Sequence, residues 1–261
     1  MFKFLLKAAN SLVSFILVLA LCTAGTYAGY ALWDNNQVYA AALDVQADMI
    51  RIKPVLEDEE EGASFDELLK INPDVCGWLT LAGTKIDHPL LQGDDNLEYV
   101  NKSVYGEFSL PGSLFLDTSN AKDFSDPYSL LYGHHMENSG MFGDLDLFKD
   151  ESFFNENTAG GTLILPGHSF NLEIYACLVV EASDKNIFVP TKWQSDINGL
   201  ISYAEQNAMH LNTKALDGFD EENKPQILAM STCSNEFTNA RTIVLAVMRP
   251  HKAITQEEEL T

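Results

Sequence analysis

The sequence has few basic residues for its length. Its 261 residues include 16 Lys and Arg against 38 Asp and Glu, which gives a formal net charge of −22. A strongly acidic chain repels polyanions and attracts cations. The charge therefore argues against nucleic-acid binding and favours cationic partners.

Cysteine is also scarce, and its spacing excludes two common cysteine-based architectures. The four cysteines are Cys22, Cys76, Cys177 and Cys233, and no two of them form a CxxC pair. This pattern indicates neither a zinc finger nor a dense disulfide framework, and we expect no metal and no cofactor. Cys76 and Cys177 each lie in an apolar stretch where buried free thiols are common, so a Cys76–Cys177 disulfide stays open as the alternative.

Charged side chains are absent from Ala8 to Trp33. As a helix, these 26 residues would reach about 39 Å, more than the ~30 Å hydrocarbon core of a bilayer, so we expect a transmembrane anchor at 8–33. Lys3 and Lys7 precede this segment and acidic residues follow it. The positive-inside rule then places residues 1–7 in the cytoplasm and the rest of the chain outside the cell. The alternative is a cleaved signal peptide, although the apolar run is longer than the ~7–15 residues usual for one.

The chain beyond the anchor divides into three parts. Residues 34–62 form a polar spacer that ends in the acidic run LEDEEEG, which we interpret as solvated. Residues 63–252 form one exported domain, with no internal repeat and no second domain boundary. Residues 253–261 form an acidic C-terminal tail.

The exported domain is mostly β. Apolar runs separated by Gly, Asp, Asn and Pro predict strands within 77–92, 113–118, 129–135, 162–166, 171–180, 226–233 and 241–248. A capping-box pattern, Ser64 with Glu67 three residues on, predicts a helix at the start of the domain. Apolar positions at helical spacing behind Ser195 predict a second helix within 195–210, just before the last two strands.

Three side chains of this domain form a candidate catalytic set. Cys233 ends one apolar run and Arg241 opens the next, so two neighbouring strands would bring them to one end of the sheet. His134 and His135 follow LLYG, where a strand should end, and adjacent strand residues point to opposite faces, so at most one of them should enter a given site. Taken singly, each has an ordinary explanation: a buried core cysteine, a salt-bridged surface arginine, and a surface histidine pair or metal site.

Together these residue types suit acyl transfer. In an unperturbed cysteine–histidine pair, the thiolate–imidazolium form is only about 1% of the neutral pair. A nearby guanidinium favours the thiolate, and it donates hydrogen bonds to the oxyanion that forms when a carbonyl is attacked. A histidine can protonate the leaving amine and later take a proton from the incoming nucleophile.

The sequence resembles the sortases, the cysteine transpeptidases of Gram-positive bacterial surfaces. The resemblance rests on LLYGHHM, on STCSNEFTNAR, and on the strand order that puts histidine first and Cys and Arg last. The stretches INPDVCGWLTLAGTKIDHPLLQGDDNLEYVNKSVYGEF and GSLFLDTSN are similar to the class B branch, as is the helix before the cysteine strand. The resemblance extends from about Ser64 to Pro250.

The resemblance implies an eight-stranded sortase-type β-barrel with an N-terminal helix and a helix inserted before the cysteine strand, preceded by one transmembrane helix. It also implies a catalytic trio of His134, Cys233 and Arg241, with His135 as the spare histidine. The residues that it places along the substrate groove are Asn96, Tyr132 and Ser231.

The implied function is that of a membrane-anchored cysteine transpeptidase. It would cleave a C-terminal sorting signal of secreted proteins through a thioester at Cys233 and transfer the acyl group to an amine of a cell-wall precursor. Three alternatives stay open: a pilin lysine as the acceptor in pilus polymerisation, hydrolysis of the thioester by water, and a non-catalytic exported binding domain.

Overall fold

The computed structural model describes residues 2–54, 65–136, 139–234 and 236–251. The chain splits into two compact units, Met1–Ala41 and Ala42–Thr261. The acidic run of the predicted spacer, the capping residue Ser64 and the predicted tail 253–261 lie outside the described residues.

The first unit is helical. Helix α1 runs from Phe2 to Ile50 without a proline and continues beyond the predicted anchor 8–33. Apolar side chains such as Leu17 and Leu21 are more than half exposed along it. Helix α1 is long and apolar enough to cross a membrane, where such exposed apolar side chains would contact lipid.

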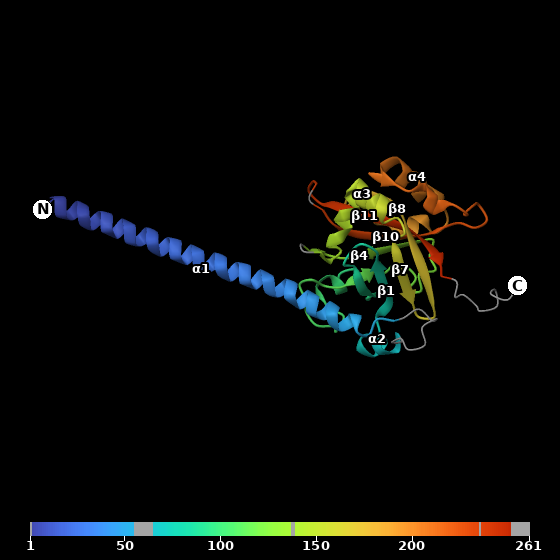
Figure 1. Cartoon of the computed structure of the whole chain (residues 1–261), viewed down its shortest axis with the longest axis horizontal. Helices are drawn as coiled ribbons and strands as arrows, with labels where there is room; N and C mark the ends of the chain where they lie inside the picture. The colour runs from blue at the N-terminus through green and yellow to red at the C-terminus, as the bar shows by residue number, and fades with distance from the viewer. Residues whose placement is uncertain (1, 55–64, 137–138, 235, 252–261) are drawn as a thin grey trace. The chain divides into compact units, whose positions relative to one another are not determined.

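The second unit is built on β-strands, as the sequence predicts (Figure 1). The strands are β1 Val75–Leu81, β2 Asp87–Leu91, β3 Leu114–Leu116, β4 Tyr128–Tyr132, β5 His135–Met136, β6 Gly140–Met141, β7 Gly161–Leu165, β8 His168–Glu181, β9 His210–Leu211, β10 Gln226–Cys233 and β11 Ala240–Pro250. The helices are α2 Phe65–Ile71, α3 Glu151–Glu156 and α4 Asn198–Asn207, and the short 3₁₀ segments are η1 Glu98–Asn101, η3 Gly143–Lys149, η4 Pro190–Trp193 and η5 Thr213–Leu216.

Eight of these strands close into a barrel, which confirms the expected fold. Their order is β11-β10-β4-β3-β2-β1-β7-β8, and the pairing of β8 with β11 closes the circle. The β2–β3 and β4–β10 pairs are parallel and the other pairs are antiparallel. The two-residue strand β9 extends the sheet beside β8, and β5 and β6 form a separate pair.

Strand β10 is buried on both faces, and a cluster of apolar side chains that includes residues of α4 packs on its outer side. Ile227 and Ala229 pack in one cluster with residues of α4, including Leu200. Leu228 and Met230 point to the opposite face, which lines the barrel interior, and are equally buried. This double burial explains why β10 reads as a nearly continuous apolar run.

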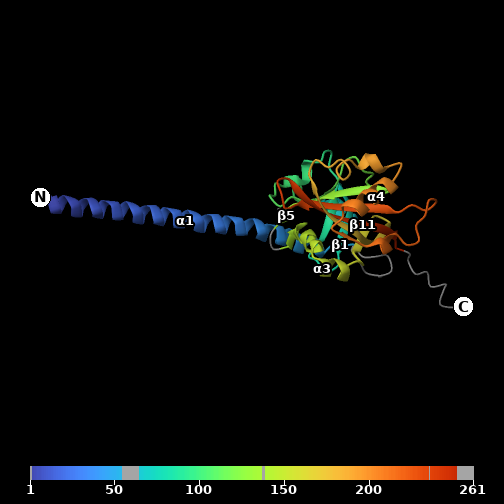
Figure 2. The same cartoon turned by 90° about the horizontal axis from the view of Figure 1, so that it is seen from above.

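A second cluster packs on another side of the barrel. It joins Met49 of α1 and Leu68 of α2 to Trp78 of β1 and Leu91 of β2. Helices α3 and α4 overlap in Figure 1 but separate in the turned view of Figure 2, so they cover different parts of the barrel. Helices thus pack against the barrel at several places.

The late helix lies within the predicted range 195–210, since it begins at Asn198 and ends at Asn207. Ile197 is at its cap position, and the Asp196 side chain accepts the Asn198 N–H at 3.1 Å. All four cysteines are free, so Cys76 and Cys177 are two buried thiols and form no disulfide.

Candidate active site

Cys233 and Arg241 are brought together by the register of two antiparallel strands. Cys233 is the last residue of β10, Arg241 is the second residue of β11, and the two are direct cross-strand partners. Direct partners share one face of a sheet. The Arg241 guanidinium donates to the carbonyl of Ala240 at 2.9 Å, and within the described part of the chain it forms no ion pair, so its charge is available to a bound substrate.

His134 reaches the same place from β4. Strand β4 runs parallel to β10 with Tyr132 beside Ser231, and the Gly133 N–H then donates to the Ser231 carbonyl at 3.2 Å. A Cβ on Gly133 would lie 2.4 Å from the Leu114 side chain, so the close approach requires glycine. The imidazole Nε2 of His134 lies 2.8 Å from the Val100 carbonyl oxygen. Since a carbonyl only accepts, Nε2 carries the hydrogen of this bond and Nδ1 is left for proton transfer.

The site continues the barrel face on which the apolar cluster with Leu200 packs. Ser231 and Cys233 follow Ile227 and Ala229 on the outer face of β10, where Ser231 is buried and Cys233 is exposed. A cavity of about 370 Å³ opens there. Its lining residues are Asn96, Val100, Phe115, Tyr132, Gly133, His134, Ala182, Phe188, Ser231, Thr232, Cys233 and Arg241. The structure therefore brings all six residues that the sequence singles out to one cavity.

The Tyr132 side chain is held on three sides. Its ring stacks on Phe188 with 6.4 Å between ring centroids and lies 5.3 Å from the ring of Phe115. Its hydroxyl donates to Asp117 at 2.8 Å. Burial, together with the charge of Asp117, raises the pKa of Tyr132 far above its usual value, so the phenol keeps the proton that it donates.

His135 points to a different set of groups, as strand alternation predicts. Its Nε2 lies 3.1 Å from a carboxylate oxygen of Asp146, which also accepts from Thr242 at 2.7 Å and from Lys149 at 2.9 Å. Burial opposes ionisation of Asp146, but these hydrogen bonds and charges outweigh it and lower its pKa. His135 is thus held by a neighbouring ionic network and does not line the cavity.

The buried cysteines are poor nucleophiles. Burial raises the pKa of the Cys76 and Cys177 thiols to about 12. Cys233 is exposed at the cavity. Of the three cysteines of the barrel unit, it is the one whose sulfur can meet a substrate.

Sequence reasoning missed the apolar walls of the cavity. Val100, Phe115 and Phe188 come from three separate segments and meet only when the barrel closes. Phe188 could not have been found from the sequence, since it lies in a connection without a motif. Phe115 could have been found, because it lies in the stretch GSLFLDTSN, which also contains Asp117.

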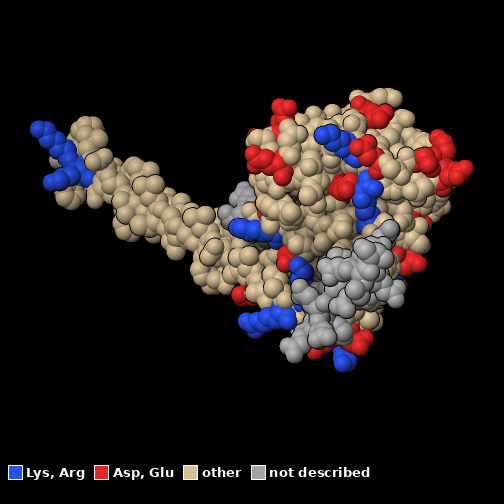
Figure 3. Space-filling view, turned by 45° about the vertical axis from the view of Figure 1, so that its right-hand side comes forward, with Lys and Arg blue, Asp and Glu red and all other residues tan. Residues whose placement is uncertain are grey.

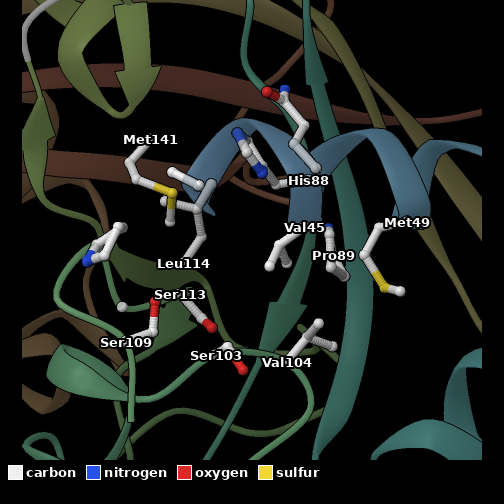
Figure 4. Close-up of a pocket in the computed structure, with 14 residues that line it drawn as sticks. Val45, Met49, His88, Pro89, Ser103, Val104, Ser109, Ser113, Leu114 and Met141 are labelled. Atoms are coloured by element: carbon white, nitrogen blue, oxygen red, sulfur yellow. The ribbon is translucent and has the colours of Figure 1, made fainter. Parts of the chain in front are cut away.

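A second, smaller cavity lies elsewhere in the barrel unit (Figure 4). It measures about 30 Å³ and is lined in part by Val45, Ser103 and His88. Figure 4 shows the His88 imidazole on the side of Met141, away from Ser103. Burial lowers the pKa of His88 to about 4, and its Nε2 has no hydrogen-bond partner among the described residues. This histidine is therefore neutral at physiological pH.

Known proteins resemble this chain in sequence and in fold. A Streptococcus pyogenes class B sortase involved in pilus biogenesis is 39% identical, and the match covers 71% of this chain and 97% of that chain with a TM-score of 0.64. The chain belongs to the class B sortases. Clostridium perfringens sortase B matches at 32% identity over 71% of this chain and 99% of that chain, with a TM-score of 0.62.

A more distant relative is also a sortase B. Listeria monocytogenes sortase B is 28% identical over 213 residues, which is 80% of this chain and 82% of the relative. No family model matches the chain. As a class B sortase, the protein is a cysteine transpeptidase with a mostly β, barrel-shaped domain, and the cavity at the end of β10 is its candidate active site.

Proposed function

We propose that this sortase cleaves the C-terminal sorting signal of secreted proteins through a thioester at Cys233 and transfers the acyl group to an amine. The observation that carries the proposal is the pairing of Cys233 with Arg241 in a cavity that His134 also lines. The assigned roles are nucleophile for Cys233, acid and base for His134, and oxyanion donor for Arg241. Asn96, Tyr132 and Ser231 are the proposed substrate contacts.

In the first step, the Cys233 thiolate attacks the carbonyl carbon of a threonine peptide bond in the signal. The carbon–sulfur bond forms, and the developing oxyanion receives hydrogen bonds from the Arg241 guanidinium. The carbon–nitrogen bond then breaks as the His134 imidazolium gives its proton to the leaving amine. The products are a thioester at Cys233, a free peptide amine and neutral His134.

In the second step, an acceptor amine attacks the thioester. A new carbon–nitrogen bond forms and the Cys233 thiolate leaves, while neutral His134 takes the extra proton of the amine. The thiolate and the imidazolium are thereby restored. The acceptor that we propose is an amine of a cell-wall precursor.

A pilin lysine is the second candidate acceptor. The Streptococcus pyogenes relative at 39% identity is involved in pilus biogenesis, which favours this alternative. The net charge of −22 suits either cationic amine. Figure 3 shows acidic side chains in several groups over the visible face of the barrel unit, although screening within ~8–10 Å limits their reach.

We propose that residues 8–33 anchor the enzyme in the cell membrane, with residues 1–7 in the cytoplasm and the catalytic domain 63–252 outside. Support comes from α1, which is long and apolar enough to span a bilayer, and from Lys3 and Lys7 before its apolar part. A membrane-impermeant thiol reagent applied to intact cells should label Cys233, and a Cys233→Ala chain should stay unlabelled. Labelling only after the cells are opened would contradict this orientation.

Product analysis tests the function. The full chain in detergent is incubated with fluorogenic peptides that each hold one threonine peptide bond in varied flanking sequence, with and without added wall-precursor amine or pilin. We expect cleavage that is lost in Cys233→Ala, and mass spectrometry should find the acyl fragment joined to one acceptor. Hydrolysed product alone, unchanged by either amine, would instead indicate a thiol hydrolase.

A further inference from the structure

Asp117 stands behind the cavity and contacts two of its walls. It follows β3, is 4% exposed, and is not among the lining residues. Its Oδ2 accepts the Asn96 side-chain amide at 2.9 Å and the Tyr132 hydroxyl at 2.8 Å. Its Oδ1 accepts the backbone N–H of Ser119 at 2.9 Å and the Ser119 hydroxyl at 2.6 Å. One buried carboxylate therefore organises four donors, two of which belong to residues of the cavity.

These bonds fix which way the Asn96 amide faces. Its Oδ1 accepts the backbone N–H of Thr118 at 2.8 Å, while its Nδ2 donates to Asp117. A flipped amide would set its NH₂ against the Thr118 N–H and its oxygen against the carboxylate, so only one orientation satisfies both contacts. The second N–H of Nδ2 has no partner within the described segments, and Asn96 lines the cavity.

The carboxylate of Asp117 also determines which hydrogen-bonding group Tyr132 presents to the cavity. Its hydroxyl proton is donated to Asp117, which leaves the phenolic oxygen as an acceptor toward the cavity. The cavity wall therefore carries a fixed donor on Asn96 and a fixed acceptor on Tyr132. A donor and an acceptor side by side match the C=O and N–H groups of an extended peptide backbone.

We propose that Asp117 is a positioning residue for the sorting-signal peptide: it holds Asn96 and Tyr132 so that their free donor and acceptor bind the peptide backbone. This inference rests on the proposed function, because it takes the peptide as the occupant of the cavity. Asp117 itself touches neither the substrate nor Cys233, His134 or Arg241.

The backbone of Asp117 makes hydrogen bonds that hold the fold and that do not depend on its side chain. Its backbone N–H donates to the Leu130 carbonyl at 2.9 Å, and its carbonyl accepts the Gln92 side chain at 3.0 Å. A side-chain substitution keeps both bonds. Asp117→Asn is a close match in shape, yet its one NH₂ group meets a donor wherever it points, since both carboxylate oxygens face donors.

Steady-state kinetics of the full chain in detergent provide the test. With a peptide that the wild type cleaves, Asp117→Asn should raise KM about tenfold and leave kcat within about threefold. Without peptide, the rate at which a methanethiosulfonate reagent modifies Cys233 should stay unchanged. In an Asn96→Ala/Tyr132→Phe background, Asp117→Asn should add no further change in KM, because both partners are already gone.

Asp126→Asn is the matched control. Asp126 also accepts a side-chain amide, Asn120 at 3.0 Å, and a backbone N–H, Ala121 at 2.7 Å, but neither partner lines the cavity. Its KM should equal that of the wild type. The proposal is overturned if Asp117→Asn leaves KM unchanged, if Asp126→Asn raises KM as much, or if the Asp117→Asn effect persists in full in the double-variant background.

A second readout needs no turnover. The side-chain ¹⁵N–¹H resonances of Asn96, assigned by their loss in Asn96→Ala, should shift in Asp117→Asn and stay in place in Asp126→Asn. Unchanged resonances in Asp117→Asn would overturn the positioning role. If the wild type cleaves no peptide, the proposed function fails, while this spectrum still decides whether Asp117 holds Asn96.

Discussion

At the residue scale, Arg241 is the side chain whose chemistry is hardest to replace. It lies opposite Cys233 in the strand register and forms no ion pair with any described residue. Arg241→Lys keeps the charge but loses the planar fork that can donate two hydrogen bonds at once. We expect kcat to fall about 10²- to 10³-fold, the usual cost of losing an oxyanion donor, with the unfolding midpoint nearly unchanged. A variant with more than about a third of wild-type kcat would contradict the role of Arg241.

The two adjacent histidines should differ sharply. His134→Ala removes the imidazole that lines the cavity, and we expect it to abolish peptide cleavage. His135→Ala removes only a contact with Asp146 outside the cavity and should keep at least about a third of the activity. Parallel assays of the two purified variants provide the measurement. The opposite result, with His135→Ala inactive and His134→Ala active, would show that the site assignment is wrong.

His88 should make the fold sensitive to acid. Burial lowers its pKa to about 4, against about 6.5 in an unfolded chain, although the charge of Asp87 opposes the shift. Between these values the unfolded state binds more protons, so the free energy of unfolding falls as the pH drops from about 6.5 toward 4. At pH 4.5, protonation of His88 in the unfolded state should lower the free energy of unfolding by on the order of 2 kcal/mol relative to neutral pH.

Urea unfolding of the full chain across this pH range provides the measurement. His88→Gln should be less sensitive to pH than the wild type by that amount. His168→Gln, which changes an exposed histidine, should follow the wild-type curve. Identical curves for the wild type and His88→Gln would rule out the buried neutral histidine as a source of acid sensitivity.

Single residues were predictable from the sequence where a strand ends in a reactive group. Cys233 and Arg241 close and open two apolar runs, and that pattern alone brings them to one edge of the sheet. Asp117 and Phe188 were not predictable in this way. Each acts through a partner far along the chain, so its surroundings exist only once the barrel has closed.

At the scale of elements, the connection after β4 determines where His134 stands. Gly133 allows close packing against Leu114 and Phe142, because an added Cβ would lie 2.4 and 2.6 Å from their side chains. Gly133→Ala should therefore displace His134, lower stability by about 1–3 kcal/mol and reduce cleavage more than tenfold. Thermal unfolding and kinetics of the same preparation measure both effects.

Gly167→Ala is the control for this change. Gly167 has a φ of 86° and no atom within 4 Å of an added Cβ, and it lies in the turn between β7 and β8. The substitution should cost stability of similar size, about 1–2 kcal/mol, through backbone strain alone. Its activity should match the wild type. Equal loss of activity in both variants would mean that Gly133 acts only on global stability.

The order and type of the main elements follow from the sequence, but their ends do not. Apolar runs separated by Gly, Asp, Asn and Pro predicted the strands of the barrel, because strands such as β10 and β11 are buried along most of their length. Helix α4 lies within the predicted range 195–210, but it begins three residues after Ser195, where the Asp196 side chain accepts the free N–H of Asn198. The short strands β5, β6 and β9 carry too few residues for any periodicity.

At the scale of the whole molecule, an apolar N-terminal helix precedes in sequence a barrel domain with an exposed thiol, that of Cys233. The barrel unit holds three of the four cysteines, and burial leaves Cys233 as the exposed one among them. In the proposed mechanism, the sulfur atom of Cys233 carries the acyl group from the sorting signal to the acceptor amine.

Intact-protein mass spectrometry of the full chain can detect this acyl-enzyme. With a cleavable peptide and no amine, we expect a mass increase equal to one acyl fragment, located at Cys233 by proteolysis and released when an acceptor amine is added. Cys233→Ala should show no increase. Peptide cleavage without any adduct at Cys233, or an adduct on a different residue, would rule out the thioester mechanism at Cys233.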